Sequence, residues 1–455
     1  MSFRAASLFL LAISVLSLGF TGCSREQEGQ CSPVLVVGMD GLEWDVLEPL
    51  LDKGRLPNFE KLIQRGIGGS IQTAVPTFSP VLWSTIATGF GPQEHGILNF
   101  AEMGADGQLG KPYTSNTRRV PAIWNMAAEQ NRRVLSTAWW VSWPAEAISN
   151  GRIVASYAAQ AQGRILWKSG VWKDGLPDLT YPNELIEEIL PALQNGAPEG
   201  PLRKEFNSVF GSIPQGGDWD FPWQRDRLFR VAYHGDRTHH RIMLEQLQKE
   251  VADLNMVYYG LPDVSGHYFW RYREPSAFSY FIPEEQIARL GDRIDRVYEV
   301  MDRWLGELLE AVPEDTHILI LSDHGMHAFN LANPRQIQSG GHEDGPDGVF
   351  IFAGPSAKQT GLLPKEERRV TNIFQIAPAL LHLLNLPVPE DMPAPVPSQL
   401  FTNDWSSSHP VEKGPSLRPG FRKATPPRIP GKGYDKEFID SMRAIGYVGG
   451  EEEEE

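Results

Sequence analysis

The stretch VLVVGMDG, residues 34–41, decides the fold expected for this chain. It is a continuous apolar run that stops at an acid followed by a glycine. A run without alternation of apolar and polar residues is typical of a strand buried on both faces. Similar runs occur at residues 254–259, 317–321 and 348–352, and each ends in a polar or glycine-containing turn. The four runs predict the strands of one central sheet.

Helical patterns lie between these runs. From Ile287 to Val312, for example, apolar residues recur at helical spacing, at Val297, Met301, Leu305 and Leu308. Alternation of strands and helices predicts an α/β fold, a three-layer α/β/α sandwich with a mostly parallel central sheet.

The stretch from about 103 to 241 differs from the rest because it is rich in tryptophan, with frequent glycine and proline near 195–222. We expect an inserted cap region over the strand ends. The alternative is that these aromatic residues fill the core of one large domain.

Composition limits the function. The chain has 455 residues, 41% of them hydrophobic, and a formal net charge of -15. A chain of this length can bury a large core. Its negative charge does not favour binding to a nucleic-acid polymer. An anionic substrate would need local attraction from metal ions or backbone dipoles.

The N-terminus has the pattern of an export signal. Arg4 precedes an apolar run from Leu8 to Phe20, and Cys23 follows Gly22. The run is short for a membrane span. The end of the run resembles the lipobox of bacterial lipoproteins, which implies a signal peptide over 1–22, lipidation of Cys23 and a tether over 23–33. An exported chain anchored in the cell envelope, at the periplasmic face or the cell surface, is therefore expected. The alternative is an ordinary secretory signal.

Residues 34–390 are expected to form the catalytic domain. The tail over 391–455 is polar and proline-rich and ends in five glutamates. A docking helix is expected over Tyr434 to Tyr447, followed by a solvated acidic end.

Acids and histidines follow the predicted strands. In open α/β sheets, ligands bind outside the carboxyl ends of the strands. Carboxylates with imidazoles are typical zinc ligands, and a mixed set can hold two ions. Any one of these residues alone would more often be structural. The candidate ligands are Asp40, Asp263, His267, Asp323, His324 and His342.

The segment PTFSPVLWSTIATG, residues 76–89, predicts a helix with Ser79 as its N-cap and Pro80 as its first residue. Gly89 is expected to end this helix. The positive end of a helix favours a phosphoryl group and the alkoxide of Ser79. The alternative is a plain helix cap.

Together these motifs resemble the alkaline phosphatase superfamily, and more closely its type I phosphodiesterase/nucleotide pyrophosphatase branch. The resemblance extends from about Val34 to Pro389. The motifs that carry it are VLVVGMDG, TFSPVLWSTIATG with GPQEHGI, GLPDVSGH, LILSDHGM and GGHEDGPDGVFIFAGP.

The resemblance implies a hydrolase of phosphate esters that binds two divalent metal ions, with zinc as the expected metal. Ser79 would be the nucleophile and form a covalent phospho-serine, with Thr77 as the alternative nucleophile. One metal would be bound by Asp40, Ser79, Asp323 and His324, and the other by Asp263, His267 and His342.

One departure from the family pattern leaves the substrate class open. Phosphodiesterase relatives commonly carry asparagine three residues after the nucleophile, where this chain has Leu82. A phosphomonoesterase, or a transferase of phosphoryl-alcohol groups onto cell-envelope substrates, is one alternative. An inactive lipoprotein that keeps the fold as a binding module is another.

Overall fold

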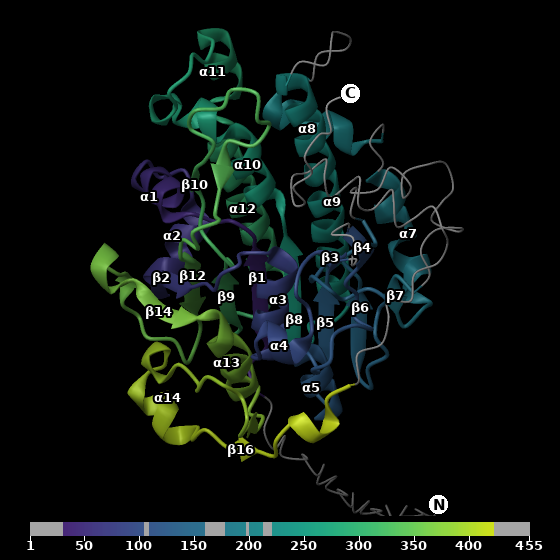
Figure 1. Ribbon diagram of the computed structural model, residues 1–455. Coiled ribbons are helices and arrows are strands. Elements are labelled where there is room, and N and C mark those ends of the chain that lie inside the picture. Colours follow the sequence, from purple (N-terminus) through teal and green to yellow (C-terminus); the bar gives the residue numbers. More distant parts are fainter. Residues whose placement is uncertain (1–30, 104–108, 160–177, 197–199, 213–220, 423–455) are drawn as a thin grey trace, which may run out of the picture. The chain divides into compact units, whose positions relative to one another are not determined.

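The computed structural model describes residues 31–103, 109–159, 178–196, 200–212 and 221–422. The predicted α/β fold is confirmed, with a ten-stranded sheet in the order β13-β2-β12-β9-β1-β8-β5-β6-β7 and β14 paired with β2 (Figure 1). The strands of this sheet are β1 (Val34–Met39), β2 (Gly66–Gln72), β5 (Val134–Thr137), β6 (Gly151–Val154), β7 (Thr180–Tyr181), β8 (Leu254–Tyr259), β9 (His317–Leu321), β12 (Gly348–Ala353), β13 (Gly361–Leu362) and β14 (Arg369–Asn372).

The four strands predicted from the sequence are neighbours at the centre of the sheet. Strand β1 pairs in parallel with β8 on one side and with β9 on the other. Strand β12 pairs antiparallel with β9, so the sheet is mostly and not wholly parallel. The chain therefore enters β12 at the edge where β1, β8 and β9 end. This arrangement brings the segments after three strands and the segment before a fourth to one edge.

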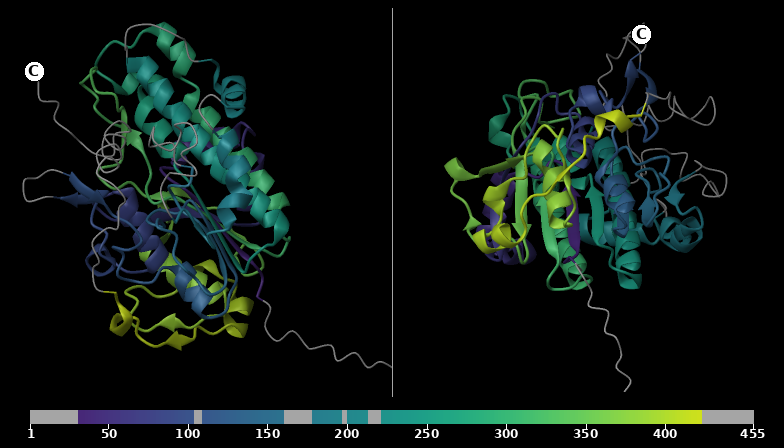
Figure 2. Two further views of the ribbon diagram at one scale, coloured as in Figure 1. Left: turned by 90° about the vertical axis from the view of Figure 1, so that its right-hand side faces the viewer. Right: turned by 90° about the horizontal axis from the view of Figure 1, so that it is seen from below.

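Helices cover both faces, as Figure 2 shows. Along β1, Val34 and Val36 belong to one hydrophobic core, and Leu35 and Val37 belong to the other. The first core is covered by α3 (Ser79–Thr88), α5 (Ile123–Glu129), α7 (Leu185–Asn195) and α13 (Ile376–Leu383). The second is covered by α1 (Trp44–Asp52), α2 (Pro57–Gln64), α8 (Leu202–Phe210), α9 (Phe221–Lys249), α10 (Leu261–Arg273) and α12 (Arg293–Glu310).

The other α-helices and strands among the described residues are short. They are α4 (Pro92–His95), α11 (Glu284–Leu290) and α14 (Asn403–Ser408), with the strand pairs β3 (Ala101–Met103) and β4 (Leu109–Pro112), β10 (His327–Ala328) and β11 (Gly340–Gly341), and β15 (Val388–Pro389) and β16 (Lys413–Gly414).

The stretch from about 103 to 241, expected to be an inserted cap region, supplies strands to the central sheet. Strand β5 continues the sheet in parallel from β8, and β6 and β7 follow it. The tryptophans Trp124, Trp139 and Trp143 are fully buried in the first core. The aromatic residues in the described parts of this stretch therefore pack into the core, as the alternative interpretation expected. A domain boundary within the stretch stays a prediction.

Buried residues extend beyond both predicted ends of the catalytic domain. Cys31, in the predicted tether, is a buried free thiol, and Leu400 and Phe401, in the predicted tail, are buried in the first core. The expected signal peptide, Cys23, the docking helix and the acidic end lie outside the described residues. Within the described part, none of the helices combines the length and apolar character needed to cross a bilayer.

Candidate functional site

The structure brings all six predicted ligands together at the carboxyl edge of β1, β8 and β9. Asp40 follows β1, and Asp323 and His324 follow β9. Asp263 and His267 lie one turn apart on α10, in a segment expected to begin as a turn. His342 follows β11. The ligand atoms of Asp40, Asp323 and His324 lie within 4.8 Å of one another, as do those of Asp263, His324 and His342.

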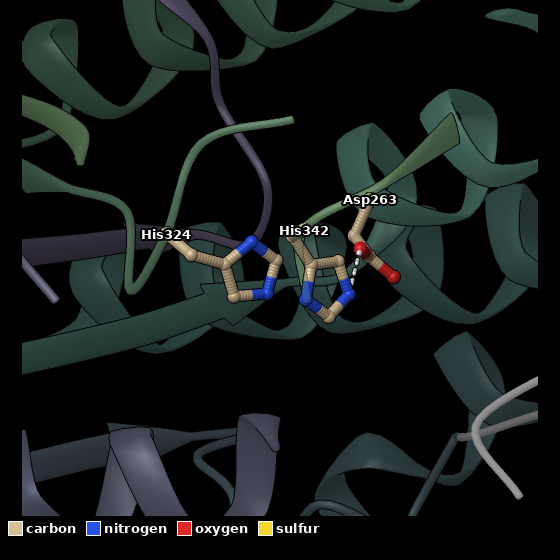
Figure 3. A group of neighbouring side chains, drawn as sticks. All are labelled: Asp263, His324 and His342. Carbon is tan, nitrogen blue, oxygen red and sulfur yellow. Dashed lines mark ion pairs between the residues drawn. The ribbon is translucent and has the colours of Figure 1, made fainter. Parts of the chain in front are cut away.

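His324 lies between the two groups. Its ring stacks on that of His342, with centroids 3.8 Å apart, and His342 in turn faces Asp263 (Figure 3). His267 completes the second predicted set, because its Nε2 lies 3.2 Å from Asp263 Oδ1 and 3.3 Å from His342 Nε2. The two sets predicted from the sequence are therefore adjacent parts of one cluster.

Hydrogen bonds orient the three imidazole rings in the same way. Nδ1 of His267 lies 2.9 Å from the carbonyl oxygen of Gly340, and Nδ1 of His324 lies 2.9 Å from that of Gly325. A carbonyl oxygen only accepts, so Nδ1 carries the hydrogen in both rings. In a neutral ring the Nε2 atom then keeps its lone pair, and in all three histidines Nε2 is the atom that faces the cluster.

Thr77 orients the third ring. Its hydroxyl donates to the carbonyl oxygen of His342 at 3.0 Å, so its oxygen accepts from Nδ1 of the same residue at 2.9 Å. The sequence offered Thr77 only as an alternative nucleophile, and no spacing rule indicated this supporting contact.

Two of the carboxylates are buried with oxygens that accept no hydrogen bond from the described residues. Asp40 accepts from Tyr258 Oη at 2.7 Å and Trp83 Nε1 at 3.0 Å through one oxygen. Among the described residues, no hydrogen-bond donor reaches the other oxygen of Asp40 or either oxygen of Asp323. Burial, with a smaller contribution from Asp263, raises the pKa of Asp40. Burial and the adjacent Asp40 raise the pKa of Asp323 well above its usual value.

The second set already holds a positive charge. Burial acts to raise the pKa of Asp263, but His267 and His342 outweigh it, so that this pKa is lowered. Burial acts to lower the pKa of His267, but Asp263 raises it to about 9. Burial and the neighbours His324 and His267 lower the pKa of His342 to about 2. At neutral pH a proton therefore rests on His267, and a cation bound there must displace it.

Ser79 lies in the first turn of α3, one residue from the expected position. The helix begins at Ser79 and its N-cap is Phe78, so the prediction that Ser79 is the N-cap was wrong by one residue. Helix boundaries shift this easily because end residues share their hydrogen bonds with the preceding loop. Gly89 ends the helix with a φ of 75°, as predicted. The Ser79 hydroxyl is buried and finds no hydrogen-bond partner in the described part of the chain.

Contacts on either side of Ser79 connect it to the cluster. Two residues earlier, Thr77 binds His342, and one helical turn later, Trp83 donates to Asp40. The nucleophile candidate is thus held between contacts to both ligand sets. Tyr258, Trp83 and Gly340 were not identified as site residues from the sequence, because aromatic and glycine residues at such positions usually serve packing.

The donor set fits divalent cations. Buried carboxylate oxygens that face imidazole nitrogens form the mixed surroundings in which zinc is commonly bound. Paired cations would also remove the repulsion among three buried carboxylates.

Sequence relatives match part of the chain. Venom phosphodiesterase 2 of Crotalus adamanteus is 32% identical over 130 residues, which are 27% of this chain and 16% of that protein. Venom phosphodiesterase CdcPDE of Crotalus durissus collilineatus is also 32% identical over 130 residues, 27% of this chain and 15% of that protein. The matched part spans less than a fifth of either relative.

Solved structures are similar at low identity. Murine ectonucleotide pyrophosphatase/phosphodiesterase 5 has a TM-score of 0.44 and 14% identity, covering 78% of this chain and 95% of its own. Phosphonoacetate hydrolase from Sinorhizobium meliloti has a TM-score of 0.38 and 16% identity, covering 65% of this chain and 57% of its own.

The family model described as type I phosphodiesterase/nucleotide pyrophosphatase matches residues 34–366. These residues run from the first strand of the sheet past β12 and contain Ser79 and all six candidate ligands. Because this match covers most of its length, the chain belongs to the type I phosphodiesterase/nucleotide pyrophosphatase family.

Proposed function

We propose that this chain hydrolyses phosphate esters, diesters in preference to monoesters, with Ser79 as nucleophile and two zinc ions held by the six clustered side chains. One observation carries the proposal. Three imidazole rings present Nε2 to buried carboxylates. The buried Ser79 hydroxyl, which has no hydrogen-bond partner among the described residues, lies along the chain between Thr77 and Trp83, which contact the two ligand sets. Burying polar groups without hydrogen bonds costs folding free energy. Their presence in the core therefore supports a role in binding or catalysis.

The proposed reaction has two steps, and both take place at Ser79. Bound zinc ions would lower the pKa of a hydroxyl and neutralise charge on phosphoryl oxygens. Ser79 Oγ would attack phosphorus in line with the leaving oxygen and give up its proton to solvent. The bond from phosphorus to the leaving oxygen would break, and the leaving group would take up a proton and depart as an alcohol. Water would next attack phosphorus of the phospho-serine from the opposite side, and the bond from phosphorus to Ser79 Oγ would break. Oγ would regain a proton from the attacking water, and the phosphate product would leave. Positioning and electrostatic stabilisation supply most of the rate in phosphoryl transfer.

Metal analysis together with a substrate pair tests the proposal. We expect about two zinc ions per chain, from the two ligand sets, and faster hydrolysis of bis(p-nitrophenyl) phosphate than of p-nitrophenyl phosphate. Faster hydrolysis of the monoester would instead identify a phosphomonoesterase. Absence of bound metal after zinc addition would identify a binding module that keeps the fold.

Replacing Thr77 by valine tests the orientation of His342. Valine keeps the shape of threonine but removes the acceptor for His342 Nδ1. We expect zinc affinity to fall by about 10- to 100-fold, as for other losses of a contact that orients a ligand. Activity should recover at high zinc concentration. Zinc titration of Thr77→Val and Thr77→Ser measures this, and Thr77→Ser should bind zinc nearly as the wild type does. Loss of activity that zinc cannot restore would indicate that Thr77 is the nucleophile.

We also propose that the chain is exported and anchored in the cell envelope through a lipid on Cys23. The support comes from the order of Arg4, the apolar run to Phe20, and Gly22 before the cysteine. Labelling with palmitate in a bacterial host should mark the wild type and not Cys23→Ala. Labelling of both proteins would leave only an ordinary secretory signal.

A further inference from the structure

Hydrogen bonds join the loops that follow β1 and β9, both of which carry candidate ligands. Ser322 Oγ accepts from Leu42 N at 3.0 Å and donates to the carbonyl oxygen of His324 at 2.7 Å. One residue further along the first loop, Oε2 of Glu43 accepts from Met326 N at 3.0 Å. Glu43 therefore holds the chain just beyond the ligand His324, although it is not itself one of the six clustered ligands.

A single peptide group connects Glu43 to the ring of His324. The N–H of Met326 and the carbonyl of Gly325 belong to one planar peptide, and they point in opposite directions. The N–H donates to Glu43, and the carbonyl oxygen accepts from Nδ1 of His324 at 2.9 Å. An acceptor that fixes one end of a peptide also fixes the direction of its other end. Hydrogen bonds linked in such a chain also strengthen one another.

Glu43 is itself held in place. Its backbone N donates to Tyr298 Oη at 2.8 Å, and its Oε1 accepts from Asp45 N at 3.1 Å, at the start of α1. On the other side of the contact, Gly325 N donates to the carbonyl oxygen of Pro346 at 2.9 Å. The loop passes so close to Glu43 that a Cβ at Gly325 would collide with Oε2. The acid is thus a fixed acceptor against which the loop is pressed.

Resting on the proposed function for its reference to zinc, we propose that Glu43 is a positioning residue for His324. It acts through the peptide between Gly325 and Met326, which keeps a hydrogen on Nδ1 and Nε2 turned to the cluster. Metal-binding histidines commonly donate their second ring N–H to a carboxylate or a backbone carbonyl. Here a carbonyl is the acceptor, and an acid from another loop fixes that carbonyl. Because His324 borders both ligand sets, one residue outside the cluster supports both ions.

The Nδ1 proton of His324 in the metal-free chain tests this role without depending on zinc. NMR of protein with isotope-labelled histidine should detect this proton in the wild type, because its bond to the Gly325 carbonyl oxygen slows exchange with water. Glu43→Ala should abolish the signal, because the freed peptide can turn its carbonyl away. The Nδ1 signal of His267 should remain, since its acceptor is the carbonyl oxygen of Gly340.

Two further variants separate the contact from other effects. Glu43→Gln should keep the His324 signal, because the side-chain carbonyl of glutamine can still accept from Met326 N. Glu48→Ala is the matched control, since Glu48 is an acid of α1 that pairs with Arg368 on the far side from the cluster ligands, and it should also keep the signal. Zinc titration should show about 10- to 100-fold weaker binding to Glu43→Ala than to the wild type. Glu43→Gln and Glu48→Ala should bind zinc nearly as the wild type does.

The two histidine signals separate positioning from a general structural role. An unchanged His324 signal in Glu43→Ala, even with a lower melting temperature, would mean that Glu43 only caps α1, and would overturn the proposal. Loss of both signals would also overturn it, because the Ser322 bridge should keep the loop folded. Absence of bound zinc in the wild type would contradict the proposed function by itself, while the His324 signal still decides the role of Glu43.

Discussion

Replacing Ser79 by alanine is expected to lower hydrolysis of bis(p-nitrophenyl) phosphate by about 10⁴- to 10⁶-fold, the usual cost of losing a catalytic nucleophile. The hydroxyl is buried in the first turn of α3, between contacts to both ligand sets. Alanine removes one oxygen and leaves those contacts in place. The six carboxylate and imidazole ligands remain, so the variant should still bind zinc, with the loss of the Ser79 oxygen weakening only the first site. Its melting temperature should stay close to the wild type while turnover is lost.

The same helix offers a matched control. Ser84 is also buried, and its hydroxyl also lacks a hydrogen-bond partner in the described chain. Ser84 lies beyond Trp83, away from the first turn, so Ser84→Ala should keep full activity. Acid quenching during turnover, followed by peptide mass analysis, should find phosphate on Ser79. Phosphate on Thr77, or equal losses in the two serine variants, would contradict the assignment.

Removing the metal ions is expected to make folding stability strongly pH-dependent. Burial raises the pKa of Asp323 and Asp40 in the metal-free chain, and Asp263 raises that of His267 to about 9. A group with a raised pKa stabilises the fold below its ordinary pKa, and this contribution is lost as the pH rises through the folded value. The melting temperature of chelator-treated protein should therefore fall from pH 6.5 to pH 9.

Zinc should reverse this loss. The ions neutralise the carboxylates and displace the proton from His267, so their binding strengthens as the pH rises. At pH 8 we expect saturating zinc to raise the melting temperature by about 5–10 °C. Scanning calorimetry with zinc or with chelator, at several pH values, measures the gap. A gap that does not change with pH would count against the two-cation cluster.

The variant Asp323→Asn tests the role of one buried carboxylate in the same experiment. The substitution removes one of three buried carboxylates, so the metal-free variant should melt at a higher temperature than the metal-free wild type. In the presence of zinc the order should invert, because the variant has lost a ligand. Asp404→Asn, which replaces an exposed acid of α14, serves as the control and should change neither value.

Continuous apolar runs were enough to predict the centre of the sheet. Each of the four runs has apolar residues on both faces of the expected strand, so both faces must be covered. Strands β1, β8, β9 and β12 are indeed buried along their whole length. The sequence did not reveal that β5, β6 and β7 extend the sheet, because these strands are short and lie in an aromatic-rich stretch. For short strands, the partner strand and not the local pattern decides pairing.

The candidate ligands could be predicted because strand ends concentrate them at one edge of a parallel sheet. Their division between two ions was predicted only from the family resemblance. The geometry adds that His324 borders both sets, since its ring stacks on His342 while its Nε2 lies 3.3 Å from Asp40. A stacking contact between residues 18 positions apart leaves no periodic trace in the sequence.

By itself, the sequence determined the buried strands, the acids and histidines after them, and the serine at a helix start, because each depends on neighbours along the chain. Only the tertiary structure decided which way the imidazole rings face, that Thr77 supports His342, and that His327 pairs with Asp344. Those features depend on hydrogen bonds between segments far apart in sequence, and such bonds are set by how the layers pack.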